Sequence, residues 1–295
     1  MTRTRHLVRG AALTIGFSLL AACGSGGFGS AEPSALPTLK VQKYVALGDG
    51  FASAPYLGAD TSKSLKCLRS KENYPHLVST GVSASVLVDA TCVGATTKAL
   101  TSASKAPGSK KELRPQFDAV ASDTDLITIG IGIEDGNLLQ DMFRICTAEP
   151  CGDDVLAPTI LRATTAYGTS LTTALRTLQD VAPRAKIIVV GYPQLMPKTG
   201  LCDALPDMTD VQLNYAATVL DKINTLLRSA ASQTGSTFID VAELSADHTA
   251  CSDVPWVNSF RTKPGKQQAF HPVEAEQQAV ADAILDVVRS TSQAR

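Results

Sequence analysis

The chain has 295 residues, of which 44% are hydrophobic and 19% charged, a composition that supports a sizeable core and argues against global disorder. Lys+Arg number 27 and Asp+Glu 28, so the net charge is -1, and with only 5% aromatic residues the sequence predicts no nucleic-acid partner. The one long apolar run lies within residues 1–23, so no later segment is expected to span a bilayer.

The N-terminus resembles a bacterial lipoprotein signal. Three arginines among the first nine residues precede an apolar stretch at 11–20, which leads into Leu20-Ala21-Ala22-Cys23. We expect residues 1–22 to be removed as a signal peptide and the thiol of Cys23 to receive a diacylglyceryl group. An ordinary secretory signal that happens to contain a cysteine is the alternative. Under either interpretation the mature protein is exported, and lipidation would anchor it to the cell membrane on the extracytoplasmic side.

Residues 23–40 are rich in Gly, Ser, Ala and Pro and are expected to form a flexible, lipidated tether to one domain at 41–295. This domain contains five short apolar runs, each of which predicts a β-strand. They lie at Lys43–Gly48, Ala84–Ala90, Leu126–Gly132, Lys186–Tyr192 and Thr237–Val241. Runs that are apolar at nearly every position are typical of parallel strands covered on both faces.

Helical patterns alternate with these strands. One is marked by leucines spaced three and four residues apart at 171–178 and is stopped by Pro183. Another begins with Thr209 and Gln212, which have the spacing of a capping box. The last is predicted to start at Pro272, because proline suits the first position of a helix. Alternating strands and helices predict an α/β domain with a five-stranded parallel sheet.

Six cysteines remain after Cys23, an even number that indicates disulfides in an exported chain. Fifteen pairings are possible for six cysteines. The spacings favour nearest neighbours, which are Cys67–Cys92, Cys146–Cys151 and Cys202–Cys251. A metal site is not expected, because the sequence has no CxxC pair and its histidines do not accompany the cysteines at ligand spacing.

The residues that directly follow the strands are the candidates for a functional site, because ligands of parallel sheets bind at the carboxyl ends of the strands. The first strand runs into Gly48-Asp49-Gly50, and the third runs into Gly132-Ile133-Glu134-Asp135. Together with Gly94, Gly191-Tyr192-Pro193 and Phe270-His271-Pro272, these blocks resemble the SGNH (GDSL) hydrolases, in particular the actinobacterial secreted lipases and esterases. The resemblance extends over roughly residues 41 to 290 and implies a three-layer, flavodoxin-like fold. The expected arrangement of three disulfides is also similar to that branch.

The resemblance implies a definite catalytic apparatus, from which this sequence departs. In the family a serine attacks the ester, a histidine accepts its proton, and a backbone N–H, a glycine N–H and an asparagine form the oxyanion hole. Here Gly50 stands at the nucleophile position and Glu134 at the asparagine position. Gln268 occupies the place of the aspartate that orients the histidine in many members, whereas in other members a backbone carbonyl does so. Only Gly94 and His271 match the expected types, along with the backbone N–H of Gly50.

Other residues offer partial substitutes. Ser53 lies about one helical turn after Gly50, too far for a nucleophile–base pair, and is interpreted as a turn or cap serine. Asn137 could enter the oxyanion hole if the third block were shifted by three residues. Glu134 or Asp135 could combine with His271 to activate a water molecule.

Three further side chains are interpreted as structural or peripheral. His76 is expected to be structural and His248 to face solvent. Trp256 is expected to pack near the entrance of the site, and contact with an acyl or glycan ligand is the alternative for this residue.

The sequence therefore predicts a membrane-anchored lipoprotein of the cell envelope with an SGNH-hydrolase fold whose serine-hydrolase activity is lost. It would bind an acylated or glycosylated envelope ligand, without a cofactor. The alternative is an active carboxylic-ester hydrolase that uses a non-standard nucleophile or a water activated by His271.

Overall fold

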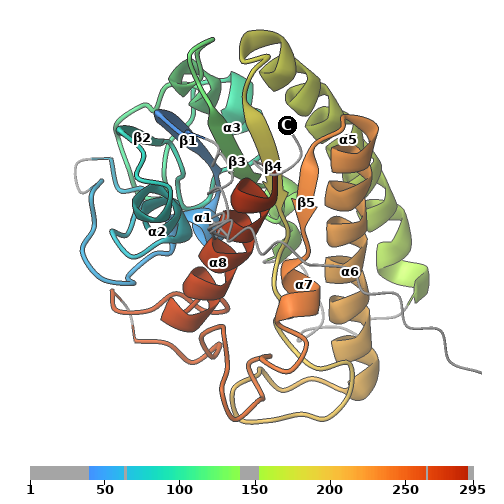
Figure 1. Ribbon diagram of the computed structural model, residues 1–295. Helices are drawn as coiled ribbons and strands as arrows, with labels where there is room; N and C mark the ends of the chain where they lie inside the picture. The colour runs from blue at the N-terminus through green and yellow to red at the C-terminus, as the bar shows by residue number, and fades with distance from the viewer. Residues whose placement is uncertain (1–39, 63–64, 140–152, 264, 292–295) are drawn as a thin grey trace, which may run out of the picture. The chain divides into compact units, whose positions relative to one another are not determined.

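The computed structural model describes residues 40–62, 65–139, 153–263 and 265–291. Its centre is a parallel sheet of five strands in the order β2-β1-β3-β4-β5 (Figure 1). The strands are β1 (Lys43–Gly48), β2 (Val86–Asp89), β3 (Leu126–Gly130), β4 (Lys186–Val190) and β5 (Thr237–Ile239). The α/β class and the five-stranded parallel sheet expected from the sequence are thus confirmed, with every predicted run contributing one strand.

Helices cover both faces of the sheet and give the domain three layers. The longer ones are α2 (Tyr74–Gly81), α5 (Asp153–Val181), α6 (Asp210–Gln233) and α8 (Glu274–Thr291). Single turns of helix are α1 (Gly50–Ser53), α3 (Lys98–Thr101), α7 (Val241–Leu244) and the 3₁₀ turns η1 (Gln116–Ala119) and η2 (Asp135–Asn137). Helices α5 and α6 pack together, and so do α2 and α8.

The alternation of side chains along the strands divides the core into two clusters. In β1, Val45 and Leu47 point into the cluster that includes residues of α5 and α6. Tyr44 and Ala46 point the other way, into the cluster with α2 and α8. Successive residues of a strand face opposite sides of a sheet, so a strand covered on both faces must be apolar throughout. The continuous apolar runs in the sequence have this cause.

The order of strands changes direction at β1, and this fixes where a site can form. Strand β1 pairs with β2 on one side and with β3 on the other, and its last residue, Gly48, lies opposite Gly130. The loops that leave β1 and β3 therefore diverge and leave a crevice at their carboxyl ends, where parallel sheets bind ligands.

Two of the three expected disulfides lie in the described residues, and both are present. Cys67 bonds to Cys92 with the Cα atoms 4.3 Å apart, and Cys202 bonds to Cys251 with the Cα atoms 5.7 Å apart. The first holds the segment after β2 against the loop that precedes α2. The expected pair Cys146–Cys151 and the signal and tether with Cys23 lie outside the described residues.

The helix boundaries confirm one prediction and correct another. The capping box forms as expected, since Thr209 and Gln212 each bond to the other's backbone N–H. Pro272, however, does not open the last helix, which begins at Glu274. Pro272 instead forms a short antiparallel bridge with Val257, so the chain stays extended for two more residues.

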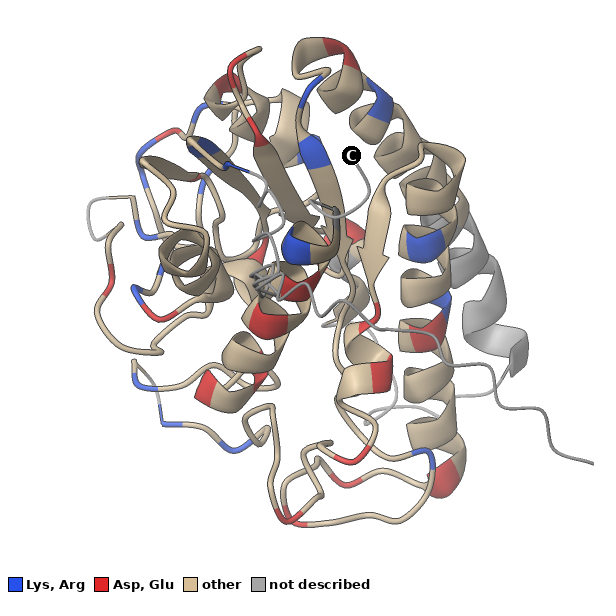
Figure 2. Cartoon of the chain, viewed as in Figure 1, with Lys and Arg blue, Asp and Glu red and all other residues tan. Residues whose placement is uncertain are grey.

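Charge does not mark out one face of the domain. In the view of Figure 2, acidic and basic residues are interspersed over the described elements, in keeping with 27 basic and 28 acidic residues in the chain. Among the described residues, no helix combines the length and the apolar character needed to cross a membrane.

Candidate functional site

Gly50 lies at the N-terminus of α1, directly after β1, at the crevice where the strand order changes. The preceding residue, Asp49, fixes this position. Its N–H donates to the carbonyl of Gly130 at the end of β3 (3.0 Å), and its carboxylate accepts from the N–H of Phe51 (2.9 Å). Asp49 is thus the N-cap of a helix of only four residues, and Gly50 is buried within this turn.

His271 lies in the segment before α8 and is 1% exposed. Its Nδ1 lies 2.9 Å from the carbonyl oxygen of Ala269, and because a carbonyl only accepts, Nδ1 carries the proton. The main chain of His271 is held by Asn258, whose N–H and side-chain amide both donate to the His271 carbonyl (2.9 and 3.0 Å). A backbone carbonyl therefore orients the ring in place of the absent aspartate, while Gln268 only accepts a bond from the His271 N–H through its carbonyl.

The histidine ring occupies the space where a nucleophile's side chain would be. A Cβ atom added to Gly50 would lie 2.4 Å from Nε2 of His271 and 2.9 Å from its Cδ2. A serine–histidine pair needs roughly 2.6–3.2 Å between the hydroxyl oxygen and the nitrogen, and the oxygen lies one bond beyond Cβ. Hence the ring sits deeper than a working base, at a place that only glycine leaves open.

The ring is held there by packing and not by hydrogen bonds at its tip. It stacks on Phe51 with the ring centroids 4.9 Å apart and an angle of 26° between the planes. Nε2 is buried and has no hydrogen-bond partner among the described residues. Burial lowers the pKa of His271 to about 4, and the bond to Ala269 opposes this shift. The imidazole is therefore neutral at physiological pH, with an unshared electron pair at Nε2.

Tyr192 connects the residues after β4 to both other central strands. Its hydroxyl donates to the carboxylate of Asp49 (2.6 Å) and accepts from the N–H of Ile133 (3.1 Å). Asp49 is fully buried, and burial raises its pKa to about 8, although the bonds from Tyr192 and Phe51 oppose this. Tyr192 comes two residues after the end of β4 and belongs to the Gly191-Tyr192-Pro193 block that resembles the family. Its bonds to Asp49 and Ile133, however, have no signal in the sequence.

Glu134 and Asp135 follow β3, as the sequence indicates. Asp135 accepts from both the N–H (2.7 Å) and the hydroxyl (2.5 Å) of Thr97, which ties the third block to the segment after β2. Glu134 is half-buried, and its pKa is raised by burial and then by the nearby charge of Asp135. Its charge also raises the pKa of Asp49. Glu134 thus brings a carboxylate, and not an amide donor, close to the end of β1.

Gly94 lies in the segment that the Cys67–Cys92 disulfide anchors beside Gly50. The side chain of Val93 would be 3.5 Å from a Cβ at position 50, so this segment borders the same space. Gly94 itself has φ +73°, and a Cβ there would lie 2.8 Å from Pro107. Both the backbone conformation and the close packing require glycine at this position.

The remaining candidates take structural places. The hydroxyl of Ser53 points back to the carbonyl of Gly50 (3.4 Å) as a helix-turn serine, and it is buried. His76 bonds to the side chain of Asn73 (2.7 Å), the N-cap of α2. His248 stacks on Trp256 with the centroids 4.3 Å apart and bonds through Nδ1 to the carbonyl of Val254. The side chain of Asn137 lies outside the described residues. Among the residues that the structure describes, no group of three His, Cys, Asp or Glu could hold a metal ion.

Comparison with known proteins identifies the family. Residues 46–279 match the GDSL-like Lipase/Acylhydrolase family. "Lipase 2" of Streptomyces coelicolor is 31% identical over 233 residues, which cover 75% of this chain and 76% of that protein. A lipase of Streptomyces rimosus is 30% identical over 83% of this chain and 86% of its own length. The chain therefore belongs to the GDSL-like lipase/acylhydrolase family, in the branch of the Streptomyces lipases and esterases.

Solved structures agree with this assignment. The extracellular lipase of Streptomyces rimosus superposes with a TM-score of 0.69 at 27% sequence identity, and the match covers 84% of this chain and 99% of that one. Phospholipase A1 from Streptomyces albidoflavus gives the same TM-score and coverage at 22% identity, which supports the fold. The expected three-layer SGNH-hydrolase fold is thus confirmed.

The close contact between positions 50 and 271 predicts a strong energetic coupling. Gly50→Ala is expected to lower the free energy of unfolding by about 1–3 kcal/mol, because the new methyl group overlaps the imidazole. In a His271→Ala background the same substitution should cost less than about 0.5 kcal/mol, since the ring is gone and alanine favours a helix over glycine. Urea unfolding of all four proteins measures the coupling. Equal costs in the two backgrounds would contradict this account of the contact.

The buried imidazole also predicts a dependence of stability on pH. The unfolded chain takes up a proton near pH 6.5, whereas the folded chain does so only near the His271 pKa of about 4. Stability from this group is therefore present above pH 6.5 and lost as the pH falls toward 4, by about 3 kcal/mol in total. A His271→Gln variant, which cannot titrate there, should lack this component in urea unfolding at pH 4 to 7. An imidazole that titrates near pH 6.5 by NMR would show that the ring is open to solvent.

Proposed function

We propose that this member of the GDSL-like lipase/acylhydrolase family is an exported, lipid-anchored protein of the cell envelope that does not hydrolyse esters through a serine. It holds an acylated or glycosylated envelope ligand on a scaffold that its relatives use for catalysis. The observation that carries the proposal is the position of His271, whose Nε2 lies 2.4 Å from where a Cβ of residue 50 would be.

The chemistry of acyl transfer supports this proposal. A covalent ester intermediate needs a side-chain oxygen, and glycine at position 50 has none. The developing oxyanion needs donors, but Glu134 presents a carboxylate whose negative charge opposes it. The base must accept a proton near neutral pH, yet burial lowers the pKa of His271 to about 4. Three requirements of acyl transfer therefore fail, each at a different residue: the nucleophile at Gly50, the oxyanion donor at Glu134 and the base at His271.

Hydrolysis by a water molecule is the competing function, and the relatives named as lipases favour it. Such a reaction would need Nε2 of His271 to bond to water beside the ester. Nε2 is buried against Gly50, and Phe51 covers one face of the ring. A water-activated mechanism would therefore require the ring to leave its packed position, so we favour the non-catalytic function.

The absence of serine chemistry predicts a clear result with activity-based probes. The exported protein should not be labelled by a fluorophosphonate, and its turnover of p-nitrophenyl butyrate should equal that of His271→Ala. Gly50→Ser/Glu134→Asn is the matched control. It adds a hydroxyl and an oxyanion donor, and its new Cβ displaces the His271 ring, whose Nε2 lies 2.4 Å from that position. It should exceed Gly50→Ser by about 10²–10³-fold, the usual contribution of one such donor. Labelling of any serine in the unmodified protein would overturn the proposal.

The proposed anchoring rests on the sequence around Cys23. The lipid would attach at this residue, and a diacylated cysteine with a further acyl chain gives stable membrane attachment, whereas a single chain binds only marginally. The related lipase from Streptomyces rimosus is described as extracellular, which supports export of this chain also.

Replacement of the lipidated cysteine should change the location of the protein. Cys23→Ala is expected to shift it from the membrane fraction to the culture fluid, because it removes the thiol that carries the lipid. Fractionation followed by immunoblotting measures this, with Cys202→Ala/Cys251→Ala as a control that loses a disulfide but keeps the anchor. Equal membrane retention of Cys23→Ala and the unmodified protein would refute the lipoprotein interpretation.

A further inference from the structure

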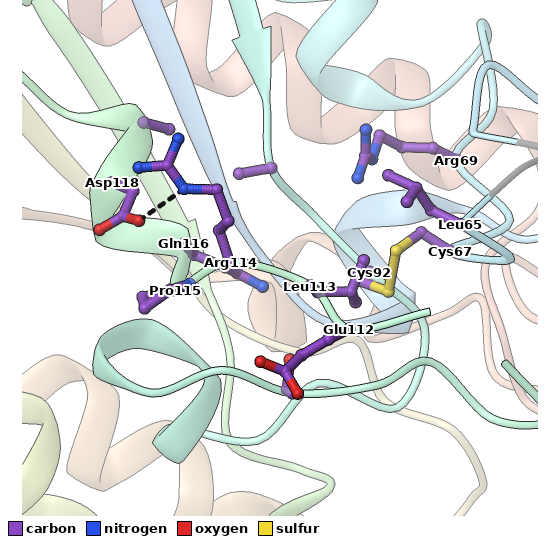
Figure 3. Close-up of a pocket in the computed structure, with 13 residues that line it drawn as sticks. Leu65, Cys67, Arg69, Cys92, Glu112, Leu113, Arg114, Pro115, Gln116 and Asp118 are labelled. Carbon is purple, nitrogen blue, oxygen red and sulfur yellow. Dashed lines mark hydrogen bonds and ion pairs between the residues drawn. A yellow bond between two sulfur atoms is a disulfide. The ribbon is translucent and has the colours of Figure 1, made fainter. Parts of the chain in front are cut away.

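A pocket of about 400 Å³ lies at the edge of the sheet formed by β2, beside the Cys67–Cys92 disulfide (Figure 3). Its volume is in the range of small-molecule sites. Much of its wall is apolar. That part is formed by the disulfide together with Leu65, Ala90, Leu113 and Ala119. None of these residues belongs to the contact between Gly50 and His271, so the pocket is a separate feature of the domain.

Arg69 gives this pocket a positively charged group whose hydrogen-bond donors are only partly occupied by the protein. Its side chain is 15% exposed, and its Nε–H donates to the carbonyl of Thr91 (2.7 Å), which fixes the guanidinium. The terminal nitrogens Nη1 and Nη2 make no hydrogen bond to any described residue. Two free N–H groups in a fixed plane match the two oxygens of a carboxylate.

The nearby carboxylate of Asp89 does not occupy the terminal nitrogens of Arg69. Asp89 lies 3.7 Å from Nε of Arg69, but its own oxygens are already bonded. Oδ1 accepts from the N–H and hydroxyl of Thr91 (3.0 and 2.6 Å), and Oδ2 accepts from the amide of Asn73 (2.9 Å). Asp89 therefore offsets part of the positive charge without binding the guanidinium tip, which favours a ligand with one negative charge over a dianion.

Two of the other charged side chains of the pocket lie away from Arg69. Figure 3 shows Arg114 and Asp118 at the opposite side, where they form an ion pair (2.9 Å) with each other. Glu112 is exposed, and Figure 3 shows it below Leu113, between the two ends of the pocket. The pocket thus has one anion-binding end, an apolar middle and a polar rim, the arrangement suited to an amphiphile.

We infer that this pocket binds a fatty acid of medium chain length, with its carboxylate on the guanidinium of Arg69 and its chain along Leu113 and the disulfide. The inference deepens the proposed function and rests on it in one respect. Because His271 fills the former nucleophile position, the acyl ligand is assigned to this pocket instead of the catalytic crevice. The two places are neighbours, since Gln116 lines the pocket and bonds to both the N–H and the carbonyl of Gly48 (2.8 and 2.9 Å).

Isothermal titration calorimetry of the exported protein with decanoate and decan-1-ol, both below their aggregation limits, tests the role of charge. Decanoate should bind at least tenfold more tightly than the alcohol, because hydrogen bonds to charged groups are worth more than neutral ones. Arg69→Gln should weaken decanoate binding at least tenfold and leave the alcohol unchanged. Glu112→Gln, at an exposed position, should tighten decanoate binding about twofold, and it tests the charge effect should Arg69→Gln fail to fold.

Two matched substitutions locate the site. Leu113→Trp should fill the pocket and abolish decanoate binding. Leu244→Trp, at an exposed leucine of α7 beyond β5 at the opposite edge of the sheet, should leave it unchanged. Equal affinity for decanoate and decan-1-ol, or decanoate binding unaffected by both Arg69→Gln and Leu113→Trp, would overturn the inference. Fluorophosphonate labelling would overturn the proposed function alone, so the two failures are distinguishable.

Discussion

The buried carboxyl group of Asp49 joins the ends of the three central strands, and the geometry of the site depends on it. The residue follows β1, its N–H bonds to the end of β3, and its carboxylate receives the hydroxyl of Tyr192 after β4. The same carboxylate caps α1 and so sets the direction of Phe51, on which His271 stacks. Burial disfavours the charged form of such a group, and its pKa of about 8 reflects this. The hydrogen bonds from Tyr192 and Phe51 keep the carboxyl group in place despite that penalty.

The absence of a side chain at Gly50 determines how His271 packs. With no Cβ at position 50, the buried imidazole occupies the space beside Gly50 and stacks on Phe51. It keeps the bond from Nδ1 to a backbone carbonyl but leaves Nε2 without a partner among the described residues. An unsatisfied buried polar atom is unfavourable, so the stacking contact has to supply the stabilisation that holds the ring there.

Local patterns in the sequence were sufficient for the architecture but not for the contacts within the site. Continuous apolar runs identified all five strands, and the Thr209 and Gln212 pair identified the start of α6, since both depend on neighbours in sequence. The start of α8 was predicted two residues early, because the bridge between Pro272 and Val257 is a tertiary contact. The bond from Tyr192 to Asp49 joins residues 143 positions apart and has no local signal. That a backbone carbonyl could orient His271 was one of the expectations from the resemblance, but the sequence does not show that it is the carbonyl of Ala269, because every residue has one.

The substitutions at positions 50 and 134 are physically coherent with one another. A carboxylate near a developing oxyanion would oppose catalysis, so a serine at position 50 would gain little while the half-buried Glu134 remained. Conversely, without a nucleophile no oxyanion forms that a carboxylate at position 134 could oppose. The remaining effects are that the pKa of Glu134 is raised and that its charge raises the pKa of Asp49. Thr97 holds the adjacent Asp135 through two hydrogen bonds, so the third block keeps its shape without an asparagine. The crevice therefore has the fold of the family's site, and hydrogen bonds of Asp49 and Asp135 hold the segments at its strand ends together.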